Sequence, residues 1–346
     1  MSPLTLLALL GFGALLPIFE NSDTDDSDET TDPPDTDPAP VVDGSSGDDL
    51  LSAVLSETLN GAEGNDTLIA EESSDGAVLN GGQGADSLSL FGTNGTLNGG
   101  LGADRIEAFL SDAPPAGTPD TSVINGDEGD DTILAVGRDG TINGGDGDDV
   151  INVQGQLGGV FGDEGDDTIH GGALDSSGGS PLSGGAGNDV LSTSDDAGLD
   201  YRSELTGGEG NDTLTTELLD AAPSVLDVLN GGAGNDVLAA SLNSPAEDPS
   251  AGVDLGTLFE VADFDATEDM LLVEIGDAGV FLAEIDAPNR ITFSIDDLED
   301  GSGALLEFMV LNADASGPLT GSILLSGVTD VDPAAVELDV QFVEFV

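Results

Sequence analysis

Residues 126–151 read GDEGDDTILAVGRDGTINGGDGDDVI and contain two copies of an eight-residue pattern that occurs ten times in this 346-residue chain. The other copies begin at residues 44, 61, 81, 99, 162, 184, 207 and 231. Positions 1 and 4 are always glycine, position 6 is always aspartate, and position 8 is always leucine or isoleucine. A pattern repeated at such short intervals predicts a solenoid built from similar coils.

Each fixed position has a physical role. Glycine permits the positive φ that lets six residues reverse the chain with carbonyl oxygens pointing inward. Position 8 places an aliphatic side chain on the short strand of about three residues expected after each turn. One such strand cannot bury a core, whereas stacked coils can. The position-8 residues are Leu51, Leu68, Leu88, Ile106, Ile133, Ile151, Ile169, Leu191, Leu214 and Leu238.

The spacing of the copies predicts where the turns lie. Successive position-6 aspartates are 17 to 27 residues apart, and a separation of 18 occurs most often. Eighteen residues accommodate two six-residue turns and two three-residue strands, so the pattern returns once per coil. All ten copies should therefore stack on one side. The looser turns at 71–76, 92–95 and 137–140, and insertions such as 112–120, should lie on the other.

The pattern resembles the nonapeptide G-G-x-G-x-D-x-U-x of the RTX, or hemolysin-type calcium-binding, family. The resemblance covers residues 44–238 and implies an all-β parallel β-roll, a right-handed β-solenoid. In that family calcium lies between turns stacked on the same side, held by backbone carbonyls of one turn and aspartates of its neighbours. Ten turns leave nine gaps, so at most about nine Ca²⁺ ions are expected, in a single row.

The resemblance implies ligands of two kinds, the position-6 carboxylates and the glycine backbone of the turns. The aspartates are Asp49, Asp66, Asp86, Asp104, Asp131, Asp149, Asp167, Asp189, Asp212 and Asp236. The glycines are Gly82, Gly84, Gly100, Gly102, Gly129, Gly145, Gly147, Gly165, Gly185, Gly187, Gly208, Gly210, Gly232 and Gly234.

Four copies depart from the family pattern, because position 2 is Ser45, Ala62, Asp127 or Asp163 instead of glycine. Aspartate tolerates left-handed backbone geometry better than serine or alanine does. The first two turns should therefore be the least regular. A disordered Gly/Asp tract is the alternative to a roll, and the unbroken position-8 aliphatics argue against it.

The rest of the chain divides by composition. Residues 1–19 are a hydrophobic segment, uncharged from 3 to 19, which could be a membrane anchor, a cleaved signal or neither. Residues 20–42 read as an acidic disordered linker, and 43–245 as the β-roll. Residues 246–346 should form a smaller all-β C-terminal domain, with strands at 270–275, 279–285, 290–295, 305–311, 322–328 and 336–346.

The C-terminal segment also has two readings. The stretch VADFDATEDMLLV at 261–273 is similar to a "DF…D.L.L" stretch that follows such repeats in the family. In the family this zone often carries an uncleaved type I secretion signal. The alternative is a cap that closes the open end of the solenoid, and the two can hold together.

Charge and residue usage exclude several classes of function. The chain has 70 acidic residues, four arginines and no lysine, for a net charge of −66. Nucleic acids and anionic membrane surfaces are therefore excluded as partners, whereas calcium is the natural counter-ion. No cysteine is present, His170 is the single histidine, and neither His-Glu-x-x-His nor Gly-x-Ser-x-Gly occurs. We expect no catalytic residues and no enzyme activity, although abundant carboxylates leave a glycosidase open.

These features predict an extracellular calcium-binding protein, secreted or at the cell surface, whose repeat array folds on binding calcium. A calcium-rigidified surface-layer or adhesive protein is the first alternative, and a secreted carbohydrate-acting enzyme is the second. Expected partners beyond calcium are a membrane bound through residues 3–19, type I secretion machinery, and protein or glycan partners of unknown identity.

Overall fold

The computed structural model describes residues 39–53, 56–71, 75–110, 119–172, 179–194, 202–218, 226–242, 253–276, 291–310 and 319–343. All of them lie within one unit, Ala39–Val346. The predicted hydrophobic segment 1–19, the linker up to residue 38 and the predicted strand at 279–285 fall outside the described residues. Within the described part of the chain, no helix has the length and apolar character that crossing a membrane requires.

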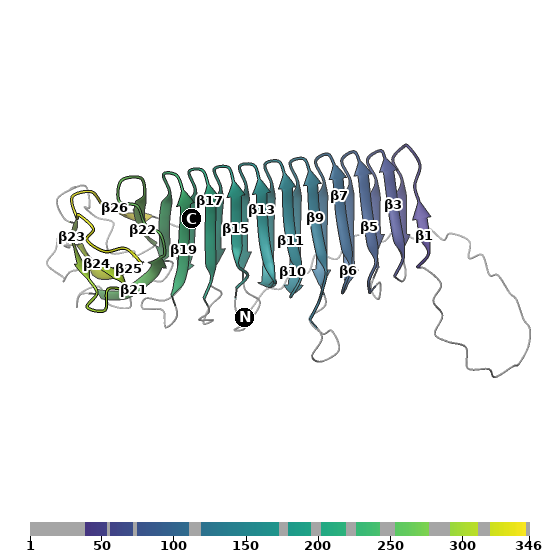
Figure 1. Ribbon diagram of the computed structural model, residues 1–346. Helices are drawn as coiled ribbons and strands as arrows, with labels where there is room; N and C mark the ends of the chain where they lie inside the picture. Colours follow the sequence, from purple (N-terminus) through teal and green to yellow (C-terminus); the bar gives the residue numbers. More distant parts are fainter. Residues whose placement is uncertain are drawn as a thin grey trace, which may run out of the picture. The chain divides into compact units, whose positions relative to one another are not determined.

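The described strands form two sheets, in which the odd-numbered strands β1 to β19 belong to one and the even-numbered strands β2 to β20 to the other (Figure 1). The odd strands are β1 (Val41–Asp43), β3 (Thr58–Glu63), β5 (Val78–Gln83), β7 (Thr96–Leu101), β9 (Val123–Glu128), β11 (Thr141–Asp146), β13 (Gly159–Glu164), β15 (Leu182–Ala186), β17 (Glu204–Glu209) and β19 (Asp227–Ala233). The even strands are β2 (Leu50–Ala53), β4 (Thr67–Ala70), β6 (Ser87–Gly92), β8 (Arg105–Leu110), β10 (Thr132–Arg138), β12 (Val150–Gln156), β14 (Thr168–Gly172), β16 (Val190–Ser194), β18 (Thr213–Leu218) and β20 (Val237–Leu242). The predicted all-β parallel roll is confirmed.

Each odd strand, the Gly-Asp turn after it and the next even strand make one coil, so β1 to β20 form ten coils. Neighbouring coils pair in parallel and in register, as Ile133 with Ile151 and Ile151 with Ile169 show. This register stacks all ten Gly-Asp turns along one edge, as predicted, and we call it the Gly-Asp edge. Val41 and Val42 already pair with β3, so the first strand begins inside the segment read as linker.

The C-terminal region continues the coils, although the sequence suggested a separate domain. Strands β21 (Val253–Val261) and β22 (Met270–Gly276) pair in parallel with β19 and β20 and form an eleventh coil. Strands β25 (Leu319–Ser326) and β26 (Glu337–Val343) pair in parallel with β21 and β22 and form a twelfth. The residues beyond 245 therefore extend both sheets of the roll.

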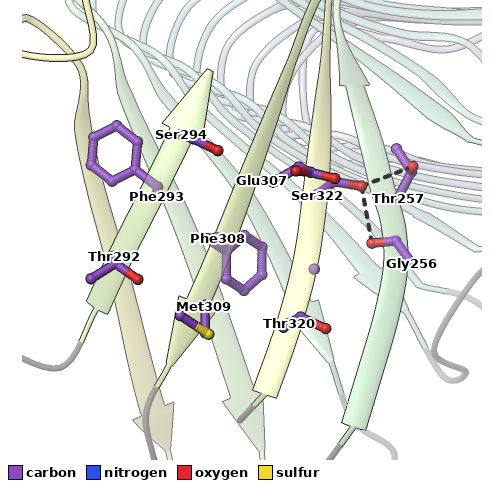
Figure 2. A pocket seen from close by; sticks show the side chains of 11 residues that line it. Gly256, Thr257, Thr292, Phe293, Ser294, Glu307, Phe308, Met309, Thr320 and Ser322 are labelled. Atoms are coloured by element: carbon purple, nitrogen blue, oxygen red, sulfur yellow. Dashed lines mark hydrogen bonds between the residues drawn. The ribbon is translucent and has the colours of Figure 1, made fainter. Parts of the chain in front are cut away.

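An antiparallel pair completes the first sheet beyond the twelfth coil. Strand β23 (Ile291–Asp297) pairs with β24 (Gly303–Val310), and β24 pairs with β25, both antiparallel. Figure 2 shows this end of the sheet, where β23, β24, β25 and β21 lie side by side. Five predicted C-terminal strands correspond to β22, β23, β24, β25 and β26 with small shifts at their ends, and β21 was missed.

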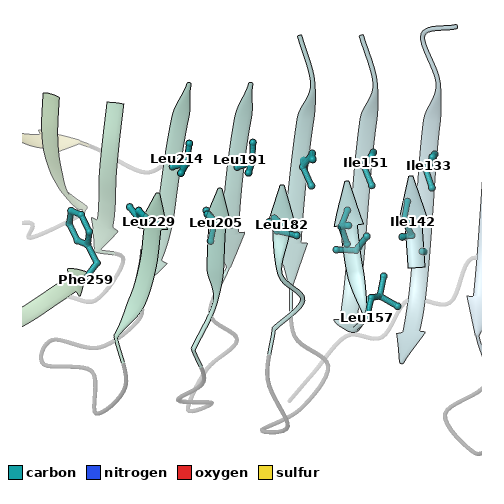
Figure 3. Close-up of a cluster of buried hydrophobic side chains, with 14 of the residues drawn as sticks. Ile133, Ile142, Ile151, Leu157, Leu182, Leu191, Leu205, Leu214, Leu229 and Phe259 are labelled. Carbon is teal, nitrogen blue, oxygen red and sulfur yellow. The ribbon is translucent and has the colours of Figure 1, made fainter. Parts of the chain in front are cut away.

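The core lies between the two sheets. Position-8 residues from Leu68 to Leu238 are fully buried, whereas Leu51 in the first coil is half-buried. A second aliphatic row faces them from the odd strands, two residues before each turn, as Figure 3 shows for Ile142, Leu182 and Leu205 opposite Ile151 and Leu191. Most strands of the roll are four to seven residues long, longer than predicted. Most odd strands include the first three positions of the turn, as β11 does with Gly144, Gly145 and Asp146.

Candidate metal centre

Two positions of each regular Gly-Asp turn have left-handed backbone geometry. In the sixth coil Gly145 and Gly147, at positions 2 and 4, have φ of 122° and 136°. Where position 2 is not glycine, Ala62, Asp127 and Asp163 still have φ of 86°, 77° and 76°. The second turn thus keeps the regular geometry, contrary to expectation. The first turn departs from it, since neither Ser45 nor Gly47 has a positive φ.

Position 1 requires glycine because no side chain would fit there. The sequence interpretation attributed this glycine to a positive φ, and the structure corrects that, since Gly144 has none. A Cβ atom on Gly144 would overlap Asp149 Oδ2 of its own turn. The carbonyl oxygen of Gly162, at position 1 of the next coil, lies close to the same point. A carboxylate oxygen and a backbone carbonyl therefore converge in the gap between two stacked turns.

Backbone carbonyls at positions 2 and 4 also point toward the next coil. A Cβ on Gly145 would overlap the carbonyl oxygen of Asp127, and a Cβ on Gly147 would overlap that of Gly129. The same relation recurs in the other coils from the third to the tenth wherever the position is glycine. Carbonyl oxygens of each turn thus face the space between that turn and the next.

The position-6 aspartates form one continuous ladder. Each Oδ1 accepts a hydrogen bond from the backbone N–H of the position-6 residue in the preceding coil, for example Asp131 N to Asp149 Oδ1 at 2.8 Å. The ladder begins where Asp49 donates to Asp66 and ends where Asp236 donates to Asp269 at 3.2 Å. Asp269 immediately precedes β22 and is the eleventh rung.

Among the residues that the structure describes, the second oxygen of these carboxylates has no hydrogen-bond partner along most of the row. The buried, unpaired Oδ2 atoms belong to Asp66, Asp86, Asp104, Asp131, Asp149, Asp167, Asp189, Asp212 and Asp236. The two end rungs differ. Asp49 Oδ2 accepts from Ser45 N at 2.6 Å and from its hydroxyl at 2.8 Å, and Asp269 Oδ2 accepts from Asp265 N at 2.7 Å. The chain's own donors thus satisfy only the ends of the row.

Burial raises the pKa of several carboxyls in the row. Desolvation, reinforced by the neighbouring aspartates of the row, raises the pKa of Asp131 and Asp149 to about 7. It raises the pKa of Asp104, Asp167, Asp189, Asp212 and Asp269 to about 6. By contrast, hydrogen bonds from Ser45, its backbone N–H first, lower the pKa of Asp49. A buried carboxylate without a partner is costly, so each inner rung requires a proton or a cation.

A second ladder runs beside the first at position 5. Its side-chain oxygens accept backbone N–H groups of the following coil, as Asp130 does from Asp148 at 3.1 Å and Asp148 from Asp166 at 2.9 Å. Ala85 and Ala103 interrupt it, because alanine has no acceptor. The middle turns add further carboxylates at positions 2 and 3, so negative charge is densest around the fifth to seventh coils.

The opposite edge lacks a uniform ladder. Individual residues there accept N–H groups of the preceding coil. Ser122 accepts from Gly95 and Ser180 from Leu157, while Asp120 accepts from Asn94. Asp120 is buried and its Oδ2 has no hydrogen-bond partner among the described residues, but it is a single residue and not part of a repeated row. The repeated oxygen-lined gap is therefore a property of the Gly-Asp edge.

The donor set fits a hard cation held largely by backbone oxygen. Among the described residues, no three acidic or histidine side chains converge on one point. A cation between two turns would therefore combine carboxylate oxygen with carbonyl oxygen, a mixture that Ca²⁺ accepts. The structure brings together the predicted aspartates from Asp66 to Asp236 and the predicted turn glycines. Asp49 differs from the others, because its Oδ2 already accepts hydrogen bonds from Ser45.

Two residues at the end of the row were missed from the sequence as members of the array. Asp269 takes the position-6 role, and the triplet Asp269-Met270-Leu271 repeats the D-x-U part of the pattern, which was the available signal. Asp263 accepts hydrogen bonds from Gly231 N at 3.1 Å and Gly232 N at 2.7 Å of the tenth turn. Neither role could be recognised from the sequence, because the turn at 262–269 is longer than the others and lacks the glycines of the repeat.

A family model, the RTX calcium-binding nonapeptide repeat, matches residues 55–88, 117–135, 160–175, 176–197, 197–218 and 227–242. These segments include seven of the ten Gly-Asp turns, in whole or in part, and the strands that flank them. No curated protein sequence matches the chain.

Proposed function

Because this chain carries the RTX calcium-binding nonapeptide repeat and belongs to that repeat family, we propose that it is an extracellular calcium-binding protein whose array folds as a β-roll when several Ca²⁺ ions bind. The row of nine buried, unpaired Oδ2 atoms carries the proposal. Each unpaired carboxylate destabilises the metal-free roll. Bound Ca²⁺ would supply positive charge in each gap and accept oxygen ligands from both turns.

The oxygens that would hold the ions belong to two neighbouring coils. The position-6 carboxylate contributes Oδ2, and the carbonyl at position 1 of the next coil faces the same gap. Carbonyls at positions 2 and 4 point into the space between the turns. The unpaired oxygens run from Asp66 to Asp236. We therefore place the candidate gaps between the second and eleventh coils, which keeps the upper bound at nine ions but shifts the row by one coil.

This coupling suits export from the cell. Where calcium is scarce the aspartates repel one another, and the chain favours an unfolded state. Extracellular calcium modules work at about 10⁻⁴ to 10⁻³ M, a level that would drive folding outside the cell. Secretion or cell-surface attachment, with a type I route or an anchor in residues 3–19, is part of the proposal.

A calcium titration of the full chain followed by circular dichroism tests the proposal. We expect little β signal in EDTA at pH 7.5 and a cooperative rise as calcium is added. Magnesium at equal concentration is the control, because its smaller ion requires stricter octahedral geometry. A signal that is already β-rich in EDTA and does not change with calcium would disprove the coupling.

A calcium-rigidified surface or adhesive protein is the second candidate. The in-register hydrogen-bond ladder from Asp49 to Asp269 favours it, because such a ladder stiffens a rod along its length. Recovery of the native protein in washed membranes, and not in culture medium, would support this role.

The absence of enzyme activity stays a prediction. In the structure His170 Nδ1 lies 2.9 Å from the hydroxyl of Ser192.

A further inference from the structure

A groove lies on the sheet formed by β21, β25, β24 and β23, beyond the last Gly-Asp turn (Figure 2). Its volume is about 550 Å³, within the range of about 300–1,000 Å³ that is usual for small-molecule sites. Its polar lining comes from Thr257, Thr292, Ser294, Glu307, Thr320 and Ser322. Because no calcium-binding turn contributes to it, the groove could serve a function of its own.

Strand register sets its polar side chains in rows. Ser294 pairs with Glu307, Glu307 pairs with Ser322, and Ser322 pairs with Thr257, so one row crosses all four strands. Figure 2 shows these four side chains in line. Two residues further along each strand, and therefore on the same face, Thr292 pairs with Met309, which pairs with Thr320.

Some side chains of these two rows are held by hydrogen bonds, and others have no partner and could bind a ligand. The Thr257 and Ser322 hydroxyls lie 3.0 Å apart, and the Ser322 hydroxyl donates to the carbonyl of Gly256 at 3.3 Å. The exposed side chains of Thr292, Ser294 and Glu307 have no hydrogen-bond or ion-pair partner among the described residues. One side of the groove is thus preorganised, and the other offers two hydroxyls and a carboxylate to a ligand.

The lining restricts the class of ligand. It contains no basic residue, and the chain carries a net charge of −66, so an anionic ligand would be repelled. Carboxylate and hydroxyl oxygens complement the hydroxyls of a sugar. Met309, on the same face as Thr292 and Glu307, adds apolar surface of the kind that covers the C–H face of a pyranose ring. We propose that this groove binds a neutral glycan.

Two features separate glycan binding from other roles. A peptide that adds to a sheet uses a free edge. Of the described strands, β23 ends the sheet and has such an edge, but the polar rows lie on the face of the sheet and run across β24, β25 and β21, which are hydrogen-bonded on both sides. Glycoside hydrolysis requires two carboxylates, and Glu307 is the one carboxylate in the lining of the groove. The site therefore holds a glycan without cleaving it, as an adhesive or surface protein would.

Native gel electrophoresis of the full chain in calcium tests this inference, with dextran, laminarin or soluble xylan cast in the gel. At least one neutral polysaccharide should retard the protein. The Glu307→Gln variant should need about tenfold more polysaccharide for equal retardation, equivalent to about 1.4 kcal/mol. Glu337→Gln, which removes an exposed carboxylate on β26 outside the groove, should migrate like the parent protein.

Three results would overturn the proposal: no retardation by any of the three polysaccharides, retardation by dextran sulfate alone, or equal loss in Glu307→Gln and Glu337→Gln. Release of reducing ends from a polysaccharide that binds would overturn the assignment as a non-hydrolytic site. Circular dichroism in calcium checks that each variant is folded. Because loss of glycan binding leaves the calcium titration unchanged, the failure of this inference is distinguishable from failure of the calcium proposal.

Discussion

The two edges of the roll are built from the same coils but obey different constraints. At the Gly-Asp edge each regular turn keeps glycine at positions 1 and 4 and aspartate at position 6, and one hydrogen-bond ladder joins eleven aspartates. At the opposite edge the acceptors follow no single pattern: Asp120 and Ser122 both accept within one coil, whereas Ser180 accepts in another. Longer spacings between copies are absorbed on that side.

The difference shows which edge depends on a ligand. The opposite edge satisfies its backbone by local solutions, so loops of different length can replace one another. At the Gly-Asp edge the glycines leave room for oxygens of the next coil, and nine carboxylate oxygens remain buried and unpaired. Such an arrangement is stable only when the carboxylates are protonated or a cation lies in the gaps. The predictions below test this contrast.

The largest effect is expected from Gly147→Ala at the Gly-Asp edge. Gly147 has φ of 136°, and its new Cβ would overlap the carbonyl of Gly129. Strain and overpacking each cost about 1–3 kcal/mol, so we expect a loss of roughly 3 kcal/mol and a much weaker calcium-induced transition. Gly172→Ala is the control, because its Cβ would meet nothing nearer than Ser194 Oγ at 3.4 Å. Equal loss in the two variants would contradict the contrast between the edges.

Asp149→Asn should have opposite effects with and without calcium. The amide oxygen can still accept the N–H of Asp131, but the buried negative charge is lost. In EDTA the variant should be more β-rich than the parent, whereas in calcium it should bind one or two fewer ions with a higher midpoint. Isothermal titration calorimetry and circular dichroism measure both effects. Asp139→Asn at the opposite edge should change neither, and a change of equal size there would refute the assignment.

The calcium-free roll should become more stable as the pH falls. The folded-state pKa of Asp131 and Asp149 is about 7, above the ordinary value of 3.8. Between those values the folded chain binds more protons than the unfolded chain, so stability rises as pH decreases from about 8 toward 4. Thermal melts in EDTA at several pH values measure this trend. With calcium present, protons compete for the same oxygens, and the calcium midpoint should rise at low pH. A calcium-free roll that melts at lower temperature on acidification would rule out this explanation.

The smallest effect is expected from Ser180→Ala at the opposite edge. The buried Ser180 hydroxyl accepts the N–H of Leu157 at 2.9 Å and donates to the carbonyl of Gly155 at 3.2 Å. Its removal should cost about 1 kcal/mol of folding stability. Calcium stoichiometry and midpoint should stay within error of the parent, measured by calorimetry. A lower number of bound ions would mean that the two edges are coupled more closely than we infer.

Much of this fold could be predicted from the sequence because the signal is local and repeated. Within one coil the pattern fixes the role of four residues, in the sixth coil Gly144, Gly147, Asp149 and Ile151. Ten copies make the pattern unambiguous. The second aliphatic row, with Ile142 as one member, was missed because it lies outside the eight-residue pattern. Its members stand two residues before each turn, on the odd strand that leads into it.

The sequence by itself determined the repeat, the single edge on which its turns stack and the acidic side chains that call for calcium. Only the tertiary structure decided which carboxylates lack partners, because Ser45 and Asp265 satisfy the end rungs through contacts made in the folded chain. It alone joined Asp269 to the row and carried the coils past residue 245, since strand pairing acts between segments that no local pattern connects. The physical reason is that repeated turns specify a coil, whereas pairing between coils specifies where the row ends.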